Sequence, residues 1–203
     1  KNMKLSCSTL YISHPTAIRH GPLGVNKQSR QSIIEHFLKL KKEGQPTNES
    51  WKTGHDIHLD HDILNPLLDQ IHLWYCHNVV GPRGPKFITD QVWSDTYNLD
   101  IDAEVWFQES LPGQGCPQHE HGTLSRCSWV YYLDVGESNN PLTFVEMQES
   151  KNEIFPVDEI NLPVYNDMVV MFPSTIHHKV YPVNTTRYIL AGNINDITYR
   201  ENK

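Results

Sequence analysis

The chain has 203 residues, 38% hydrophobic and 20% charged, a length and composition that suit one domain with a substantial core. Its formal net charge of −7 argues against binding to nucleic acid or to an anionic membrane through a broad basic surface. No apolar run approaches the roughly 18 residues of a membrane span, and the four cysteines form neither a CxxC pair nor a dense disulfide pattern, so we expect a cytoplasmic protein.

Two helices are predicted in the first part of the chain. Residues 26–42 have apolar residues at helical spacing, and Gly44 and Pro46 then end the pattern. The apolar side of this helix comprises Ile33, Ile34, Phe37, Leu38 and Leu40. A second helix is expected at residues 62–79, before Gly-Pro pairs at 81–82 and 84–85. Its inward face comprises Ile63, Leu67, Leu68, Ile71, Trp74 and Tyr75.

The histidine-rich stretch HDIHLDHD at residues 55–62 precedes the second helix. Such a stretch can bind zinc or nickel by chance. We expect instead a polar loop that leads into the helix, because Asp60 or Asp62 near the helix N-terminus would interact favourably with the helix dipole.

From residue 87 onward, short segments rich in aromatic and β-branched residues are separated by turn formers such as Pro112-Gly113, Asn139-Asn140-Pro141 and Asn166-Asp167. The expected strands include residues 87–99, 102–110, 125–133, 142–147, 167–173 and 186–192. Two helices followed by about eight strands predict a mainly β fold, a double-sheet jelly roll with the N-terminal helices packed outside the sheets. The chain would form a single domain, residues 1–203, with a helical part at 1–86 and the β core at 87–203.

Candidate metal ligands lie in the motif CPQHEHG, where His119 and His121 are two positions apart. Imidazoles at this spacing lie on one face of an extended strand, because strand side chains alternate. His177 or His178 offers a third ligand, and the spacing to Arg187, nine residues after His178, favours His178. The alternative is that these are ordinary surface histidines.

Arg187 stands in a segment that otherwise reads as apolar strand, which requires an explanation because a buried guanidinium without a partner is costly. It could form a salt bridge with an acidic residue. It could also bind a ligand carboxylate through two parallel hydrogen bonds. Tyr132 could donate to the same carboxylate, or it could simply pack in the core.

Three further residues are weaker candidates for contacts with a substrate or with the metal ligands. Asn193 is the next polar residue on the Arg187 face of its strand, and Gln108 lies on the strand before the histidine pair. Trp106, like Trp129, could shape a substrate groove. For all of them a structural role is the simpler interpretation.

The order and spacing of four segments resemble the 2-oxoglutarate and iron(II)-dependent oxygenases of the prolyl-hydroxylase-like branch. The segments are PGQG…HEH, SWVYYLD, NDMVVMFPSTIHHKV and NTTRYIL, and the resemblance spans about residues 106–193. It implies that His119 and His178 bind iron(II), and that Tyr132 and Arg187 bind the distal carboxylate of 2-oxoglutarate. The fold it implies is a double-stranded β-helix, which agrees with the jelly roll expected from the strand pattern.

One residue departs from this family pattern. Most relatives carry Asp or Glu where this chain has His121, so we predict a three-histidine site with one more unit of positive charge. That charge should favour dianionic 2-oxoglutarate and weaken the affinity for bare iron(II). Glu120 is the available carboxylate, but strand alternation directs it away from the His119 face unless a bulge intervenes.

The resemblance implies a hydroxylase that uses dioxygen and 2-oxoglutarate and releases succinate and CO2. A residue of a protein or peptide is the substrate it suggests, with free amino acids and other small molecules also open. Two alternatives remain: a non-catalytic, cupin-like module that binds a metal or ligand, and a three-histidine dioxygenase that does not use 2-oxoglutarate.

Overall fold

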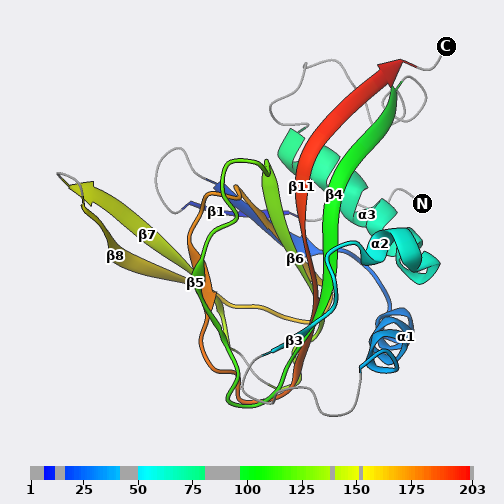
Figure 1. Ribbon diagram of the computed structural model, residues 1–203, viewed down its shortest axis with the longest axis horizontal. Helices are drawn as coiled ribbons and strands as arrows, with labels where there is room; N and C mark the ends of the chain where they lie inside the picture. Colours follow the sequence, from blue (N-terminus) through cyan, green and yellow to red (C-terminus); the bar gives the residue numbers. More distant parts are fainter. Residues whose placement is uncertain are drawn as a thin grey trace.

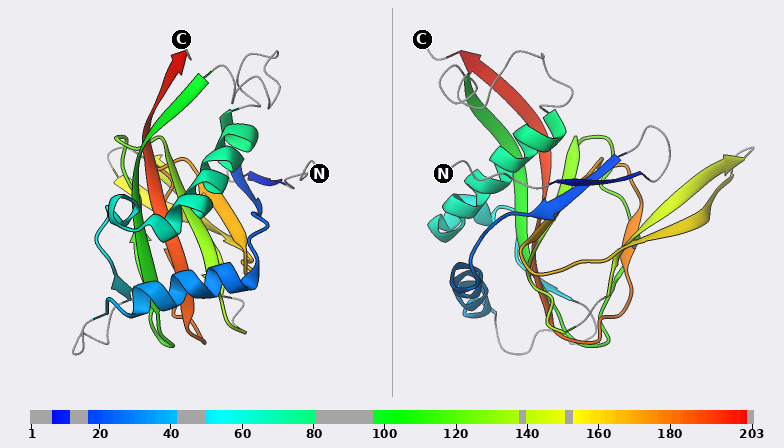
Figure 2. Two further views of the ribbon diagram at one scale, coloured as in Figure 1. Left: turned by 90° about the vertical axis from the view of Figure 1, so that its right-hand side faces the viewer. Right: turned by 180° about the vertical axis from the view of Figure 1, so that it is seen from behind.

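The computed structural model describes residues 7–11, 17–41, 50–80, 97–137, 140–150 and 153–201. Two antiparallel sheets face each other, one of seven strands in the order β1-β2-β9-β6-β11-β4-β3 and one of four in the order β5-β10-β7-β8. Helices cover the outer face of the larger sheet (Figure 1; Figure 2, left). No helix in the described part of the chain is long and apolar enough to cross a membrane.

The strands and helices have the following bounds. The larger sheet contains β1 (Ser8–Tyr11), β2 (Ala17–Pro22), β3 (Trp51–Lys52), β4 (Tyr97–Ser110), β6 (Cys127–Asp134), β9 (Met168–Phe172) and β11 (Arg187–Glu201). The smaller sheet contains β5 (Cys116–His119), β7 (Leu142–Ser150), β8 (Glu153–Leu162) and β10 (His178–Val180). The helical segments are α1 (Lys27–Leu38), α2 (Ile57–Asp60), the 3-10 turn η1 (Asp62–Leu64), α3 (Asn65–Tyr75) and the π-helical turn η2 (Cys76–Val80).

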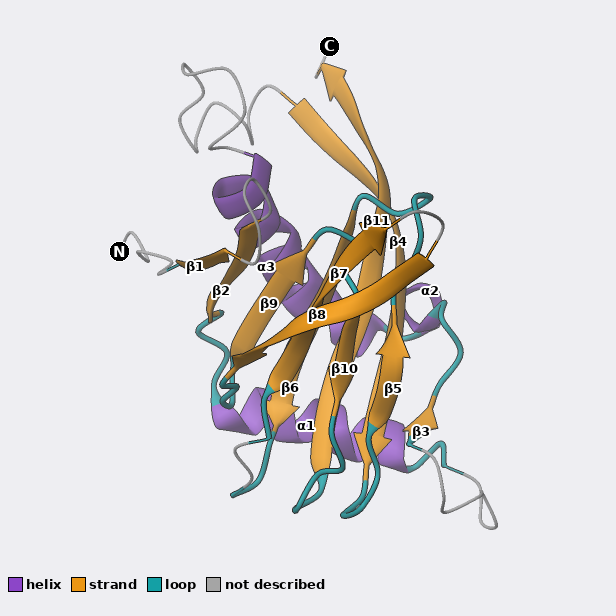
Figure 3. Ribbon diagram, turned by 90° about the vertical axis from the view of Figure 1, so that its left-hand side faces the viewer, coloured by secondary structure: helices purple, strands orange, loops and turns teal. Residues whose placement is uncertain are grey.

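Eight strands, β4 to β11, form the jelly roll that the sequence predicts, with four in each sheet. Their side chains alternate between two cores, as the two-residue period of a strand requires. On β6, Tyr131 belongs to the core between the larger sheet and the helices, whereas Tyr132 belongs to the core between the two sheets. The prediction of a mainly β jelly roll with helices outside is confirmed (Figure 3).

Helix α1 begins where the sequence predicts and ends earlier. Asn26 caps it, because its Oδ1 accepts a hydrogen bond from the Ser29 backbone N–H at 2.9 Å. Ile33, Ile34 and Phe37 are buried. Leu40, expected on the apolar side, is 46% exposed, because the helix ends at Leu38.

The second predicted helix, residues 62–79, is divided into three pieces: η1, α3 and η2. Pro66 stands in the first turn of α3 and lacks a backbone N–H, which favours a new helix start rather than continuation from residue 62. Residues 57–60 form the short helix α2, so the polar loop predicted at 55–62 is partly helical. The inward-facing residues are as expected, with all but the half-buried Ile63 fully buried.

The N-terminal part also contributes strands, which the sequence analysis did not predict. β1 pairs with β2, and β2 pairs with β9 at one edge of the larger sheet. β3 pairs with β4 at the opposite edge. The predicted strand residues 87–96, the helix-ending positions 44, 46, 81–82 and 84–85, and Asn139 lie outside the described residues.

Candidate metal centre

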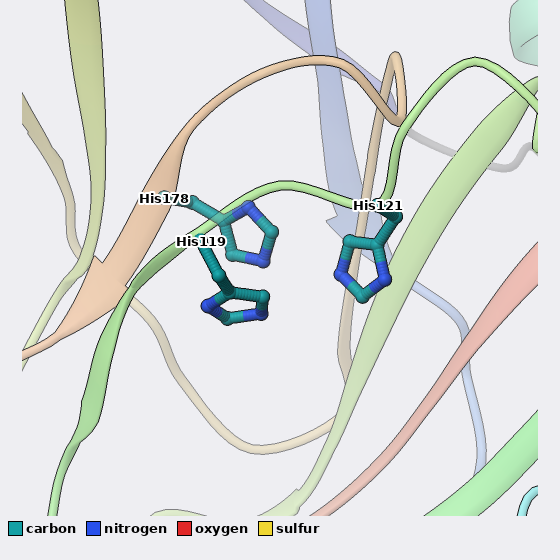
Figure 4. A group of neighbouring side chains, drawn as sticks. All are labelled: His119, His121 and His178. Carbon is teal, nitrogen blue, oxygen red and sulfur yellow. The ribbon is translucent and has the colours of Figure 1, made fainter.

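Three histidines converge between the two sheets. His119 is the last residue of β5 and His178 the first of β10, and the two are direct partners across these neighbouring strands. His121 follows two residues after the end of β5. One nitrogen from each ring lies within 4.8 Å of the others, and Figure 4 shows the rings turned toward a common point.

His121 reaches this point by a different route from the one expected from strand alternation. β5 ends at His119, so His121 belongs to the loop that follows. Its backbone N–H donates to the carbonyl of Ser174 at 2.8 Å, which ties that loop to the turn before β10. The pair is therefore aligned by a tertiary hydrogen bond as well as by sequence spacing.

The hydrogen bonds of two rings fix which nitrogen is available to a metal. Nδ1 of His119 lies 2.8 Å from the carbonyl oxygen of Pro117, and Nδ1 of His178 lies 3.0 Å from that of Ile176. A carbonyl oxygen can only accept, so each Nδ1 carries the proton and each Nε2 keeps a free lone pair. This arrangement is the usual one for a histidine that binds a metal.

Glu120 does not join the three histidines. Its side chain is exposed, and Oε2 accepts a hydrogen bond from the Gly122 backbone N–H at 2.9 Å. Gly122 has φ +75°, a conformation that suits glycine in the tight turn that follows. The carboxylate thus stabilises the turn, and His121 completes the cluster.

Burial keeps two of the rings neutral. It lowers the pKa of His178 to about 3, with the positive charge of His119 acting in the same direction. It lowers the pKa of His121 to about 4, again assisted by His119 and by Lys52. A hydrogen bond with the Cys116 thiol raises the pKa of His119, against the opposing effect of burial. His119 is therefore the ring that holds a proton in mildly acidic solution.

We predict that metal binding at pH 5.5 releases about one proton per metal ion. Three unperturbed imidazoles with pKa values near 6.5 would release nearly three, since each must be neutral to bind. The lowered pKa values of His121 and His178 remove two of these protons in advance. Anaerobic calorimetry with iron(II) in buffers of different ionisation enthalpy counts the protons, and a value near three would contradict the assignment.

Arg187 and Tyr132 line the same pocket as the three histidines. Arg187 is only 3% exposed, and its Cζ lies 5.7 Å from the centre of the Tyr132 ring. Its Nη2 donates to the backbone carbonyl of Asn140, and its Nε–H has no hydrogen-bond partner among the described residues. Within the same residues no carboxylate forms an ion pair with it. The salt bridge considered as the simpler role for Arg187 is not found there.

Tyr132 is a neutral hydrogen-bond donor in this pocket. It is buried, and burial raises its pKa to about 12 although the charge of Arg187 acts in the opposite direction. Its neighbour Tyr131 points the other way and donates to Asp167 Oδ1 at 2.8 Å. Strand alternation thus selects the second tyrosine of the pair for the pocket, as the sequence analysis expects.

The weaker candidates divide into two groups. Trp106 and Gln108 line the pocket, and the centre of the Trp106 ring lies 4.7 Å from that of His55 and 6.0 Å from that of His121. Asn193 is not among the described residues that line the pocket. It accepts from the Ser128 hydroxyl at 2.8 Å and donates to Glu104 Oε2 at 3.0 Å.

Asn193 instead takes part in the hydrogen bonds that hold the backbone of His121 in place. The Ser128 hydroxyl that it binds lies 3.0 Å from the hydroxyl of Ser174, the residue whose carbonyl holds the His121 backbone. Trp129 lines the pocket, although it also belongs to the core between the larger sheet and the helices. The stretch at residues 55–62 shows no metal-binding group among the described residues, and His61 there contacts His36 with Nδ1 and Nε2 3.0 Å apart.

Five polar or charged residues that line the pocket were not predicted from the sequence: Lys52, Ser110, Cys116, Ser128 and Lys179. The Cys116 Sγ lies 3.7 Å from His119 Nδ1, and its place three residues before His119 could have drawn attention to it. Lys52 lies in a two-residue strand far away in the chain, and nothing in the sequence around it indicates the pocket.

In sequence, no family model and no curated protein matches the chain. Solved structures match its fold. A prolyl-4-hydroxylase from Pseudomonas putida is 15% identical, with 88% of this chain and 91% of that one covered and a TM-score of 0.54. HygX from Streptomyces hygroscopicus, solved with nickel and 2-oxoglutarate bound, is 12% identical, with 88% and 82% covered and a TM-score of 0.58.

A third matching structure is a prolyl hydroxylase in complex with a hypoxia inducible factor peptide fragment from Trichoplax adhaerens. It is 13% identical, with 88% of this chain and 83% of that one covered and a TM-score of 0.51. The resemblance to 2-oxoglutarate and iron(II)-dependent oxygenases that the sequence motifs indicate is therefore confirmed at the level of the fold.

Proposed function

We propose that this protein is an iron(II)- and 2-oxoglutarate-dependent dioxygenase that hydroxylates a C–H bond of a protein residue or an amino-acid-like substrate. The observation that carries the proposal is a pocket with two features that fit the two cofactors. Three convergent imidazoles stand on one side of it, and a buried arginine without an acidic partner in the described part of the chain stands on the other.

The residues present fit an iron(II) ion. His119 and His178 have Nε2 lone pairs free, because their Nδ1 atoms are bound to backbone carbonyls, and imidazole is a suitable ligand for iron. His121 supplies the third ring. Three neutral ligands leave the full charge of the metal uncompensated, which favours a dianionic co-substrate in the remaining positions.

The residues present also fit 2-oxoglutarate. A guanidinium that is nearly inaccessible to water is costly unless a partner neutralises it, and a ligand carboxylate bound through two hydrogen bonds is such a partner. The unpaired Nε–H of Arg187 and the neutral phenol of Tyr132 are donors that this carboxylate can use. Arg187 would then hold the far end of the co-substrate while its other end faces the histidines.

When bound, iron(II) and 2-oxoglutarate together supply, with dioxygen, the oxidation of a C–H bond, with release of succinate and CO2. The chain supplies position and shelter. Val130, Phe172 and Ile189 line the pocket with apolar surface, which limits the access of water to the reacting groups.

The neighbours in fold support a substrate class. Two of the three structures described above are prolyl hydroxylases, and one of these was solved with a peptide fragment. These examples support a peptide or an amino-acid-like molecule as the substrate of the present protein. Which residue or molecule is oxidised is tested by screening peptides and free amino acids for stimulation of succinate release.

The proposed function predicts a visible charge-transfer absorption band when the purified protein is mixed anaerobically with iron(II) and 2-oxoglutarate. Air should then produce succinate, at a rate that the correct substrate increases. Iron binding without the band and without succinate would favour a non-catalytic binding module. Oxygen consumption that does not depend on 2-oxoglutarate would favour a three-histidine dioxygenase of another type.

A further inference from the structure

Lys52 is a second cation of the pocket, placed at its edge by strand pairing. It pairs with Gln108 across β3 and β4, Gln108 pairs with Ile189, and Ile189 pairs with Tyr132. Directly paired residues point to the same face of a sheet. Lys52 therefore faces the space between the two sheets, and it lines the pocket there from the outermost strand.

No carboxylate neutralises Lys52 within the described residues. It forms no ion pair there, although its charge helps to lower the pKa of His121 and opposes the rise at His119. Lys179, which also lines the pocket, is paired with Glu159. Lys52 is thus a free ammonium group close enough to the histidines to influence them.

The described pocket lining contains no Asp or Glu, in a chain that has 24 acidic residues and a net charge of −7. Glu104 and Glu120 influence His121 electrostatically, but they are engaged by Asn193 and by the Gly122 N–H. The formally charged side chains that line the described pocket, those of Lys52, Lys179 and Arg187, are therefore all positive, although the protein as a whole is acidic. Such a field attracts anions and repels cations.

The two cations lie on different strands of the larger sheet and differ in burial. Arg187 is buried on β11, whereas Lys52 is exposed on β3, and β4 lies between these strands. Two inter-strand spacings separate their backbones by about 10 Å. If 2-oxoglutarate is held by Arg187, the charge of Lys52 is left for a second anion at the edge of the pocket.

We propose that the molecule oxidised by this protein carries a carboxylate, and that Lys52 binds it. The inference rests on the proposed function, because it assigns Arg187 to the co-substrate. Lys52 is exposed, so its contact is screened by salt and acts mainly on recognition. The oxidised carbon would lie between this carboxylate and the three histidines.

The test compares matched acids and amides. Free amino acids, N-acetyl amino acids and Asp- or Glu-containing peptides are assayed for stimulated succinate release against the corresponding carboxamides. Comparing these compounds shows whether the recognised group is an α-carboxylate or a side-chain carboxylate. We expect at least one acid to exceed its amide by about tenfold or more in kcat/KM, with the preference weakening as salt increases.

Variants assign the preference to Lys52. Lys52→Gln should remove it by raising KM for the acid, and Lys52→Arg should retain most of it. Lys179→Gln removes a pocket lysine that already has an acidic partner, so it should leave the preference unchanged. The anaerobic absorption band with iron(II) and 2-oxoglutarate should persist in Lys52→Gln.

Several results would overturn the inference while leaving the proposed function intact. One is a normal absorption band in a protein whose turnover no acid in the panel stimulates. A normal band with acids and amides that stimulate turnover equally would have the same meaning. Another is a Lys52→Gln variant that keeps the acid preference. A third is an affinity for 2-oxoglutarate that falls in Lys52→Gln as much as the affinity for the acid. Absence of the band in the wild-type protein would instead reject the proposed function.

Discussion

Replacing His178 with alanine is expected to abolish stable iron(II) binding. His178 is the most buried of the three histidines, and its ring lies against both others, with ring centres 4.3 Å from His119 and 5.2 Å from His121. Only His119, at the end of β5, and His121, in the loop that follows, would remain, and two imidazoles could not surround the ion. We expect a loss larger than the roughly 10- to 100-fold decrease in metal affinity that follows removal of an outer-shell partner.

The neighbouring residue provides the matched control. His177 is adjacent in sequence and partly buried, but it does not belong to the converging group. His177→Ala should keep iron affinity within a fewfold of the wild-type value, whereas His178→Ala should lose both the metal and the absorption band. Equilibrium dialysis of iron(II) under anaerobic conditions measures both. Equal losses in the two variants would remove His178 from the site.

Replacing Arg187 with leucine is expected to eliminate most of the affinity for 2-oxoglutarate while leaving iron binding intact. Loss of one partner from a buried, hydrogen-bonded charge pair costs about 2–4 kcal/mol, which corresponds to a Kd increase of roughly 30- to 700-fold. Arg187→Lys should restore only part of the affinity, because one ammonium group cannot present paired donors. Titration of the anaerobic absorption band with 2-oxoglutarate gives these constants.

Replacing Arg187 with leucine should not lower the stability of the ligand-free protein, although it weakens ligand binding. In the described structure Arg187 is buried without a carboxylate partner and has an unpaired Nε–H. The ligand-free Arg187→Leu protein should therefore unfold at the same temperature as the wild type or a higher one. A strongly destabilised variant would indicate that Arg187 has a structural role. Retained 2-oxoglutarate affinity would remove it from the co-substrate site.

The sequence located most of the pocket because the relevant information is local. The spacing of His119 and His121, the tyrosine pair on β6 and the arginine that begins β11 lie in segments whose strand character is evident from residue type. In the structure these residues line one pocket, as expected. The family resemblance indicated Tyr132 rather than Tyr131, and the strand period explains why only one of the two faces the pocket.

Element boundaries were less well predicted. The second helix was expected to be continuous, yet Pro66 begins a new one within it. β8, β1 and β2 were not predicted, and β1 and β2 contain mixed polar and apolar residues without a clear period. They are strands because β9 provides hydrogen-bond partners for β2, and this partner is about 150 residues away in the sequence.

The sequence by itself determined the jelly-roll architecture and the residue types of the site, since both follow from short-range patterns of burial and spacing. The tertiary structure alone decided three points. The Ser174 carbonyl aligns His121 with the other rings, the Gly122 N–H engages Glu120 in a turn, and the pairing of β3 with β4 turns Lys52 toward the pocket. The first and third contacts join residues distant in the chain, and the second depends on the conformation of the loop, so residue type and spacing alone do not predict them.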